Sequence, residues 1–81
     1  MGKREIYQKL KGNPADVRFV EICKAAELFG FRFRAGKGSH RIFVRAGVRE
    51  MLNFQEVKGK AKPYQVKQFI RVIEKYNLLE E

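Results

Sequence analysis

Residues 31–45 read FRFRAGKGSHRIFVR, and the fold follows from this stretch. Over residues 31–34 phenylalanine alternates with arginine, which is the period of a strand with one buried and one wet face. Residues 35–39 contain two glycines and are expected to form a loop, because glycine relaxes the backbone. Residues 40–45 are rich in β-branched and aromatic side chains, which favour a second strand. The stretch therefore predicts an antiparallel hairpin.

The chain that follows predicts a third strand and a closing helix. We expect a turn over residues 46–49, a strand over residues 50–57 and a basic linker over residues 58–62. Pro63 suits the first position of a helix. Apolar side chains then recur at helical spacing and form one stripe: Val66, Phe69, Ile70, Ile73 and Tyr76. Asn77 can adopt the left-handed conformation that ends such a helix.

The chain before the hairpin predicts two helices. Residues 3–11 can form a short helix. Asn13 is expected to cap the first main helix and Pro14 to occupy its first position. The buried stripe of this helix is expected to contain Phe19, Ile22, Cys23, Ala26 and Phe29. Gly30 supplies a left-handed stop.

The elements follow in the order α-β-β-β-α, with residues 3–11 as an N-terminal helical extension. A chain of 81 residues favours one domain, here residues 1–81. Two amphipathic helices need an apolar surface to cover, and a sheet supplies one. We therefore expect an α+β fold, with a three-stranded antiparallel sheet and both main helices on one of its faces.

The charge is strongly basic and unevenly distributed. The chain has 18 Lys and Arg against 9 Asp and Glu, a formal net charge of +9. Residues 31–62 hold nine of these cations and two acids, a net +7. A concentrated excess of this kind is typical of polyanion binding, and RNA is the expected partner. The alternative is a solvated charged surface that prevents association by repulsion.

Several classes of protein are not expected. A single Cys excludes an intramolecular disulfide framework and fits a reducing, cytoplasmic setting. The sequence contains no apolar run of about 20 residues for a membrane span and no apolar leader at its start. One His and one Cys offer no spacing for a zinc site. We therefore expect no membrane, metal or cofactor.

The first candidate site is the glycine-rich loop that runs into His40. Lys37 adds charge, and the backbone of Gly38 and Ser39 can approach an anion closely. The loop lacks the length and the ending of a nucleotide-binding P-loop. The alternative is an ordinary hairpin connection.

The second candidate is His40 itself, as a general base. On a bound RNA, such a base could deprotonate a 2′-hydroxyl, which then attacks the neighbouring phosphate without a metal. We expect Arg41 and Arg45 to contact the RNA strand. Strand alternation places His40 on the side of Ile42 and Val44, which would normally be covered, so we expect its ring at the rim of the sheet. The alternative is a structural or merely exposed histidine.

The third candidate is the lysine series Lys58, Lys60 and Lys62. The helix that begins at Pro63 has no good side-chain cap, so its free N–H groups and positive dipole end could hold a phosphate. The alternative is a flexible basic linker.

The run Gly36-Lys37-Gly38-Ser39-His40-Arg41-Ile42-Phe43, between a helix and a closing helix, resembles the HicA (YcfA-like) toxin family. The resemblance covers about residues 14–79. It implies a double-stranded-RNA-binding-domain-like fold and the activity of a metal-independent mRNA interferase, the toxin of a type II toxin–antitoxin system. It also implies that His40 is catalytic and that a HicB-like antitoxin covers the active surface. Arg41 stands where the family often has a second His, so the general acid is water, a Lys or a Tyr.

Two other functions remain open. A non-catalytic double-stranded-RNA-binding module has the same element order, and residues 58–62 resemble its phosphate-gripping lysines. A structural or adaptor domain could place its basic face against an acidic protein.

Overall fold

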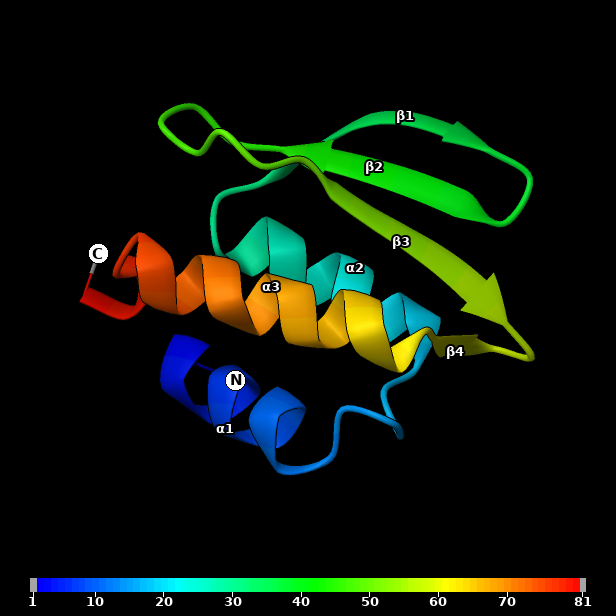
Figure 1. The fold of residues 1–81 in the computed structure, drawn as a ribbon, viewed down its shortest axis with the longest axis horizontal. Helices are drawn as coiled ribbons and strands as arrows, with labels where there is room; N and C mark the ends of the chain where they lie inside the picture. The colour runs from blue at the N-terminus through cyan, green and yellow to red at the C-terminus, as the bar shows by residue number, and fades with distance from the viewer. Residues whose placement is uncertain (1, 81) are drawn as a thin grey trace.

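A computed structural model describes residues 2–80 (Figure 1). The helices of this part of the chain are α1 (Lys3–Gly12), α2 (Phe19–Leu28), α3 (Pro63–Lys75) and a final 3₁₀ turn (Leu78–Glu80). The strands are β1 (Arg32–Lys37), β2 (His40–Val44), β3 (Leu52–Val57) and β4 (Lys60–Ala61). They form one antiparallel sheet in the order β1-β2-β3-β4.

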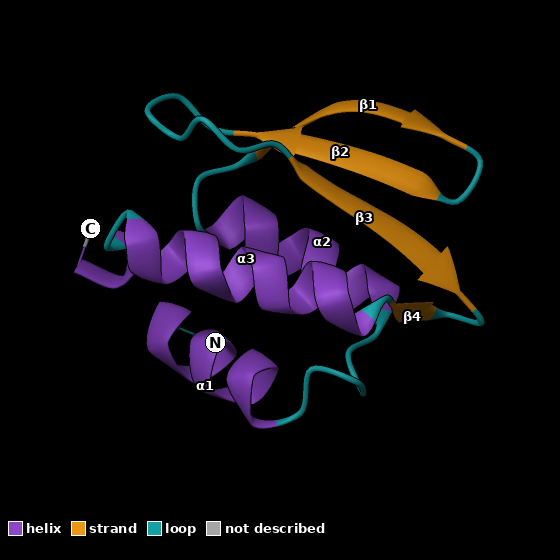
Figure 2. Cartoon of the chain, in the orientation of Figure 1, coloured by secondary structure: helices purple, strands orange, loops and turns teal. Residues whose placement is uncertain are grey.

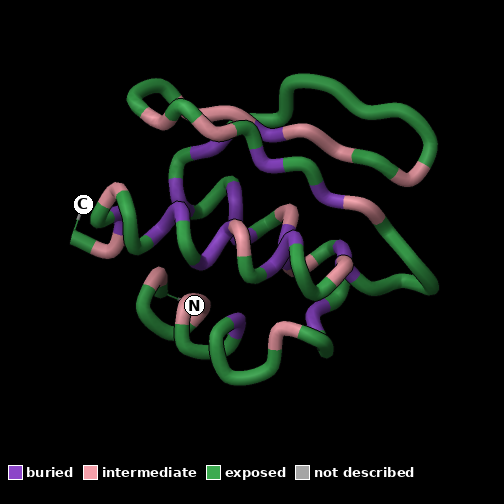
Figure 3. The backbone as a smooth tube through the Cα atoms, viewed as in Figure 1, coloured by how far each residue is buried: buried purple, intermediate pink, exposed green. Residues whose placement is uncertain are grey.

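The elements are stacked in layers. Helices α2 and α3 lie against one face of the sheet, and α1 lies beyond them on the side away from the sheet (Figures 1 and 2). This confirms an α+β fold with both main helices on one face. Strand β1 lies at the sheet edge and is exposed along its whole length (Figure 3).

The expected three-stranded sheet is wrong by one strand, because the expected basic linker contains β4. Lys58 and Gly59 both have positive φ, 52° and 81°. Two such residues in succession form the tight turn that joins antiparallel strands, although Lys is an unusual residue at the first position. The chain therefore turns back on β3 before α3 begins.

The expected start of the first main helix at Asn13 and Pro14 is also wrong, because α2 begins at Phe19. Residues 14–16 form a turn, and the two residues directly before α2 are extended and pair with β4 through Arg18 and Lys60. The Ala61 N–H donates to the Val17 carbonyl at 2.9 Å, and the Phe19 N–H donates to the Gly59 carbonyl at 2.9 Å. These bonds hold the backbone extended at residues 17 and 18, where a helix would otherwise continue.

Other helix boundaries agree with the sequence. Helix α1 covers the expected residues, α3 begins at Pro63, and both Gly30 (φ 87°) and Asn77 (φ 55°) are left-handed. The expected loop over residues 35–39 is shorter, because β1 continues to Lys37 and leaves a two-residue connection to β2.

The core lies between the sheet and the two main helices, with Phe69 at its centre. The Phe69 ring is fully buried and meets Phe29, Phe31 and Phe54 with centroid distances of 5.7, 5.9 and 5.9 Å. All three contacts are edge-to-face, a favourable geometry for aromatic pairs. One aromatic cluster thus joins both helices to the sheet.

Gln65 is the one polar side chain that is fully buried among residues 2–80. Its Oε1 accepts a hydrogen bond from the Gln55 backbone N–H at 2.7 Å. Strand β4 ends opposite Glu56, so this N–H has no partner from β4. The side-chain amide oxygen of Gln65 therefore supplies the hydrogen-bond acceptor for β3 at the position where β4 has ended.

We expect Gln65→Leu to destabilise the fold by about 1–3 kcal/mol, because a buried N–H would lose its acceptor. The measurement is the free energy of unfolding from urea titration. Gln68→Leu is the control, since Gln68 lies one turn further along α3 and is only partly buried. Equal stability of the Gln65→Leu variant and the parent would contradict the role of this bond.

Candidate nucleic-acid interface

The two faces of the sheet differ in what covers them. Phe43, Leu52 and Phe54 are buried and face the helices. Residues directly opposite in antiparallel strands share a face, and the register places the alternate residues on the other side. We call this side the open face; its residues are Arg32, Ala35, Lys37, His40, Ile42, Val44, Asn53 and Gln55. None of the described helices covers it (Figure 1).

The open face corrects the expectation that the side of Ile42 and Val44 is the covered one. Both side chains are only partly buried, whereas Phe43 between them is 3% exposed. Apolar residues occupy both sides of β2, so alternation alone does not show which side the helices take. His40 therefore needs no turn at the rim to reach solvent.

His40 is exposed at the first residue of β2. Its cross-strand neighbours are Lys37 on β1 and Gln55 on β3. Its Nδ1 lies 3.5 Å from Oδ1 of Asn53, a diagonal neighbour on the same face. The imidazole is thus accessible, with Asn53 beside one ring nitrogen and a cation on the adjacent strand.

Strand β1 supplies cations to the open face. Arg32 lies opposite Val44 and Lys37 opposite His40. Arg34 is the extra residue at a register shift, and its Nη1 lies 3.5 Å from the Met51 sulfur near the start of β3. The sequence indicated that Arg32 and Arg34 lie on a wet face, but it did not place them with His40.

The same face carries no acid. The acids of residues 32–57 are Glu50 and Glu56. Glu56 alternates with the open-face residue Gln55 and so points to the helix side. Glu50 accepts hydrogen bonds from the Tyr76 hydroxyl at 2.6 Å and from Lys75 Nζ at 2.9 Å. Positive charge on the open face is therefore not offset by its own residues.

Arg41 and Arg45 lie on the same side of the sheet as Phe43, which is the side opposite His40. Arg41 Nη1 donates to the carbonyls of His40 at 3.0 Å and Gly38 at 3.2 Å. Arg45 Nη1 donates to the Phe29 carbonyl at 2.7 Å, at the C-terminal end of α2. A guanidinium in that position complements the negative end of the helix. Arg41 thus stabilises the β1–β2 turn, and Arg45 stabilises the C-terminal end of α2.

The turn residues Gly38 and Ser39 lie at the same end of the molecule as the Lys58-Gly59 turn (Figure 1). Lys58 is exposed in its turn. Lys60 Nζ lies 2.8 Å from Asp16 Oδ1, and this ammonium lowers the pKa of Asp16. Lys62 is the N-cap of α3 and, as expected, forms no side-chain cap. Of the three lysines, Lys60 is engaged with a carboxylate.

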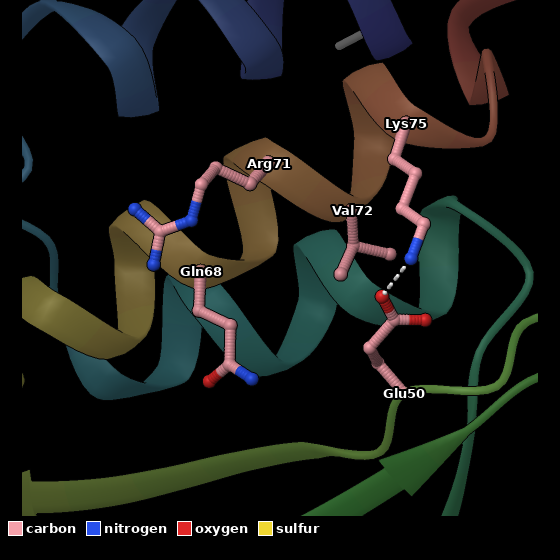
Figure 4. Close-up of a pocket in the computed structure, with 5 residues that line it drawn as sticks. All are labelled: Glu50, Gln68, Arg71, Val72 and Lys75. Carbon is pink, nitrogen blue, oxygen red and sulfur yellow. Dashed lines mark hydrogen bonds and ion pairs between the residues drawn. The ribbon is translucent and has the colours of Figure 1, made fainter.

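A separate hollow of about 310 Å³ lies beside α3, lined by Glu50, Gln68, Arg71, Val72 and Lys75. Figure 4 shows Lys75 directed toward Glu50, with their ion pair drawn as a dashed line. Both oxygens of the Glu50 carboxylate already accept hydrogen bonds, one from Lys75 and one from the Tyr76 hydroxyl. The hollow is lined by α3 and by Glu50, two residues before β3, so it is distinct from the surface around His40.

The Glu50 carboxylate is expected to make the free energy of unfolding depend on pH at acidic pH. The Tyr76 hydroxyl and then Lys75 lower the pKa of Glu50 from 4.5 to about 2. Because the folded pKa is depressed, its stabilising effect is present above pH 4.5 and is lost as the pH falls toward 2. We expect Glu50→Gln to make the urea midpoint less dependent on pH in this window. The same pH dependence in parent and variant would contradict this contribution.

Comparisons with known proteins identify no relative: no family model, curated protein or solved structure matches the chain. Within residues 2–80, no three His, Cys, Asp or Glu side chains gather as metal ligands do. None of the helices in this range has the length and apolar content to cross a membrane.

Asn53 is the site residue that sequence reasoning missed. It stands between Leu52 and Phe54, both of which are buried, so alternation could have shown that it points outward. Its closeness to His40 depends on the pairing register of β2 and β3, for which the chain carries no local signal.

Proposed function

We propose that this chain is a metal-independent endoribonuclease that acts as the toxin of a type II toxin–antitoxin system. The observation that carries the proposal is an exposed imidazole, His40, on a cationic and acid-free sheet face. A phosphate backbone requires such a face, because each contact exchanges a counterion for a Lys or Arg.

In the proposed reaction, His40 Nε2 takes the proton of a ribose 2′-hydroxyl. The 2′-oxygen then forms a bond to the adjacent phosphorus, and the bond from phosphorus to the 5′-oxygen breaks. The leaving oxygen takes a proton from water or a Lys, which yields a 2′,3′-cyclic phosphate and a 5′-hydroxyl. Asn53 Oδ1 orients the ring by accepting a hydrogen bond from Nδ1–H, which leaves Nε2 as the basic atom.

We assign each cation a role in RNA binding from its position in the fold. Lys37 and the backbone of Gly38 and Ser39 hold the phosphate beside His40, and Arg32 and Arg34 extend this contact along β1. Lys58 and Lys62 hold a more distant phosphate, whereas Lys60 also pairs with Asp16. Arg41 and Arg45, which we expected to contact RNA, position the turn and the helix beneath it.

The resemblance of residues 36–43 to the HicA family adds the biological setting to this proposal. A HicB-like antitoxin would cover the open face, and the free toxin would act on mRNA in the cytoplasm. The order α2-β1-β2-β3-α3 agrees with a double-stranded-RNA-binding-domain-like core, to which β4 and α1 are additions.

The test is cleavage of a single-stranded RNA by the purified protein in excess EDTA. We expect cleavage to persist, its products to carry cyclic phosphate ends, and expression without an antitoxin to arrest growth. Binding should weaken with salt, with a log–log slope of about −0.7 per phosphate contact. Strict metal dependence or salt-insensitive binding would overturn the proposal.

The second candidate is a non-catalytic double-stranded-RNA-binding module. It is favoured by Lys62, the N-cap residue of α3 without a side-chain cap, and by Lys58 in the turn that precedes β4. Such a protein would read A-form shape and phosphates. Tight binding to duplex RNA with no cleavage of any RNA would favour this alternative.

A further inference from the structure

Tyr64, the second residue of α3, is 61% exposed and is the most exposed of the large hydrophobic side chains in residues 2–80. A single exposed apolar residue is common in proteins and by itself carries no meaning. Three observations about its surroundings distinguish this ring.

The first observation is the position of Tyr64 relative to His40. Gln65 Nε2 donates to the Tyr64 hydroxyl at 3.4 Å, and Gln65 Oε1 accepts from the Gln55 N–H at 2.7 Å. Gln55 is the cross-strand partner of His40. A buried amide therefore connects the exposed ring to the strand beside the candidate base.

The second observation is the charge around the ring. Lys62 Nζ lies 6.0 Å from the centroid of the Tyr64 ring. Lys67 follows three residues later in the same helix, which places it on the side of Tyr64. The first turn of α3 carries no acid. No acid of this turn repels a polyanion that approaches the ring.

The third observation concerns the other aromatic rings. Phe31, Phe43 and Phe54 are 3% exposed or less. Phe33 is 50% exposed, but it lies opposite Phe43 and so belongs to the helix side of the sheet rather than to the open face. The open face thus offers cations, amides and aliphatic side chains to RNA, and its one ring, the His40 imidazole, is assigned to proton transfer rather than to stacking. Tyr64 offers such a ring near the same end of β3.

We infer that Tyr64 stacks on an unpaired base of the RNA whose backbone lies across the open face, and that the substrate is single-stranded. This inference rests on the proposed function. Bases of an A-form duplex are stacked on each other and are not free to stack on a side chain, whereas single-stranded bases are. The 2′-hydroxyl of a flexible strand can also reach the in-line position that attack on the phosphate requires.

The test uses the full chain with His40→Gln, so that bound RNA is not cleaved. Fluorescence anisotropy gives Kd for a single-stranded oligonucleotide and for the duplex of the same sequence. Tyr64→Leu should weaken single-strand binding by roughly 5- to 150-fold, the range expected for loss of one base–aromatic stack. Duplex binding should not change. Tyr64→Phe keeps the ring and should bind like the parent, and Leu28→Ala is the control for loss of an exposed apolar side chain on α2.

A second readout detects stacking directly, through the fluorescence of 2-aminopurine in the oligonucleotide. The His40→Gln protein and its Tyr64→Phe variant should quench this fluorescence, and its Tyr64→Leu variant should not. If the His40→Gln protein binds no RNA, the proposed function fails and this inference fails with it. If it binds RNA and Tyr64→Leu binds single strands equally well, the assignment of Tyr64 alone is overturned. An equal loss on single strands and duplex would also overturn it.

Discussion

His40→Gln is expected to lower the rate of RNA cleavage by about 10²- to 10⁴-fold, the usual contribution of a positioned general base. Gln can donate and accept hydrogen bonds but cannot take a proton at neutral pH. His40 is exposed, so the substitution removes no core packing and should leave the fold intact. The measurement is the single-turnover cleavage rate in EDTA, with circular dichroism to check the fold.

Gln8→Ala is the control for this experiment, because Gln8 is exposed on α1, beyond the helices that cover the sheet. Its cleavage rate should equal that of the parent. In cells, expression of His40→Gln should no longer arrest growth. Full cleavage by the His40→Gln protein would remove the imidazole from the mechanism.

Phe69→Ala is expected to cost about 3–5 kcal/mol of folding free energy, as is usual for an aromatic ring removed from a core. The ring is fully buried and contacts Phe29, Phe31 and Phe54, so its loss would leave a cavity between both helices and the sheet. In a domain of this size the midpoint of thermal unfolding should fall by roughly 15–40 °C. Calorimetry or thermal circular dichroism measures this shift.

Phe33→Ala is the matched control, because Phe33 is 50% exposed and packs on Phe43 alone among the aromatic rings. We expect it to cost clearly less than Phe69→Ala. A larger loss at Phe33 than at Phe69 would show that the aromatic cluster around α3 is not the centre of stability.

Local signals in the sequence predicted the features that depend on a few neighbouring residues. Within a helix proline fits only the first turn, which places Pro63 at a helix start, and Gly30 and Asn77 tolerate the left-handed backbone that ends a helix. The start of α2 was not predictable in this way, because residues 17 and 18 are held extended by hydrogen bonds to residues 59–61. A contact between segments about 40 residues apart outweighed the capping signal at Asn13.

The candidate site was predicted in part for a similar reason. The position of His40 at the start of a strand could be read from the hairpin pattern. Its open accessibility could not, because alternation predicted that the side of Ile42 and Val44 is covered. Which arginines share its face could not, since both sides of β2 carry apolar residues. Only the packing of α2 and α3 against Phe43 decides that Arg41 lies on the other side.

The position of β1 at the sheet edge has a consequence for self-association. An outermost strand has backbone groups on one side that could pair with the same strand of another molecule and start a growing fibril. In β1 the register shift at Arg34 interrupts the regular spacing of those groups, and Arg32 and Lys37 repel an identical neighbour. The side chains proposed to hold RNA would then also keep copies of the protein apart, and a polyanion that neutralises them would remove this protection.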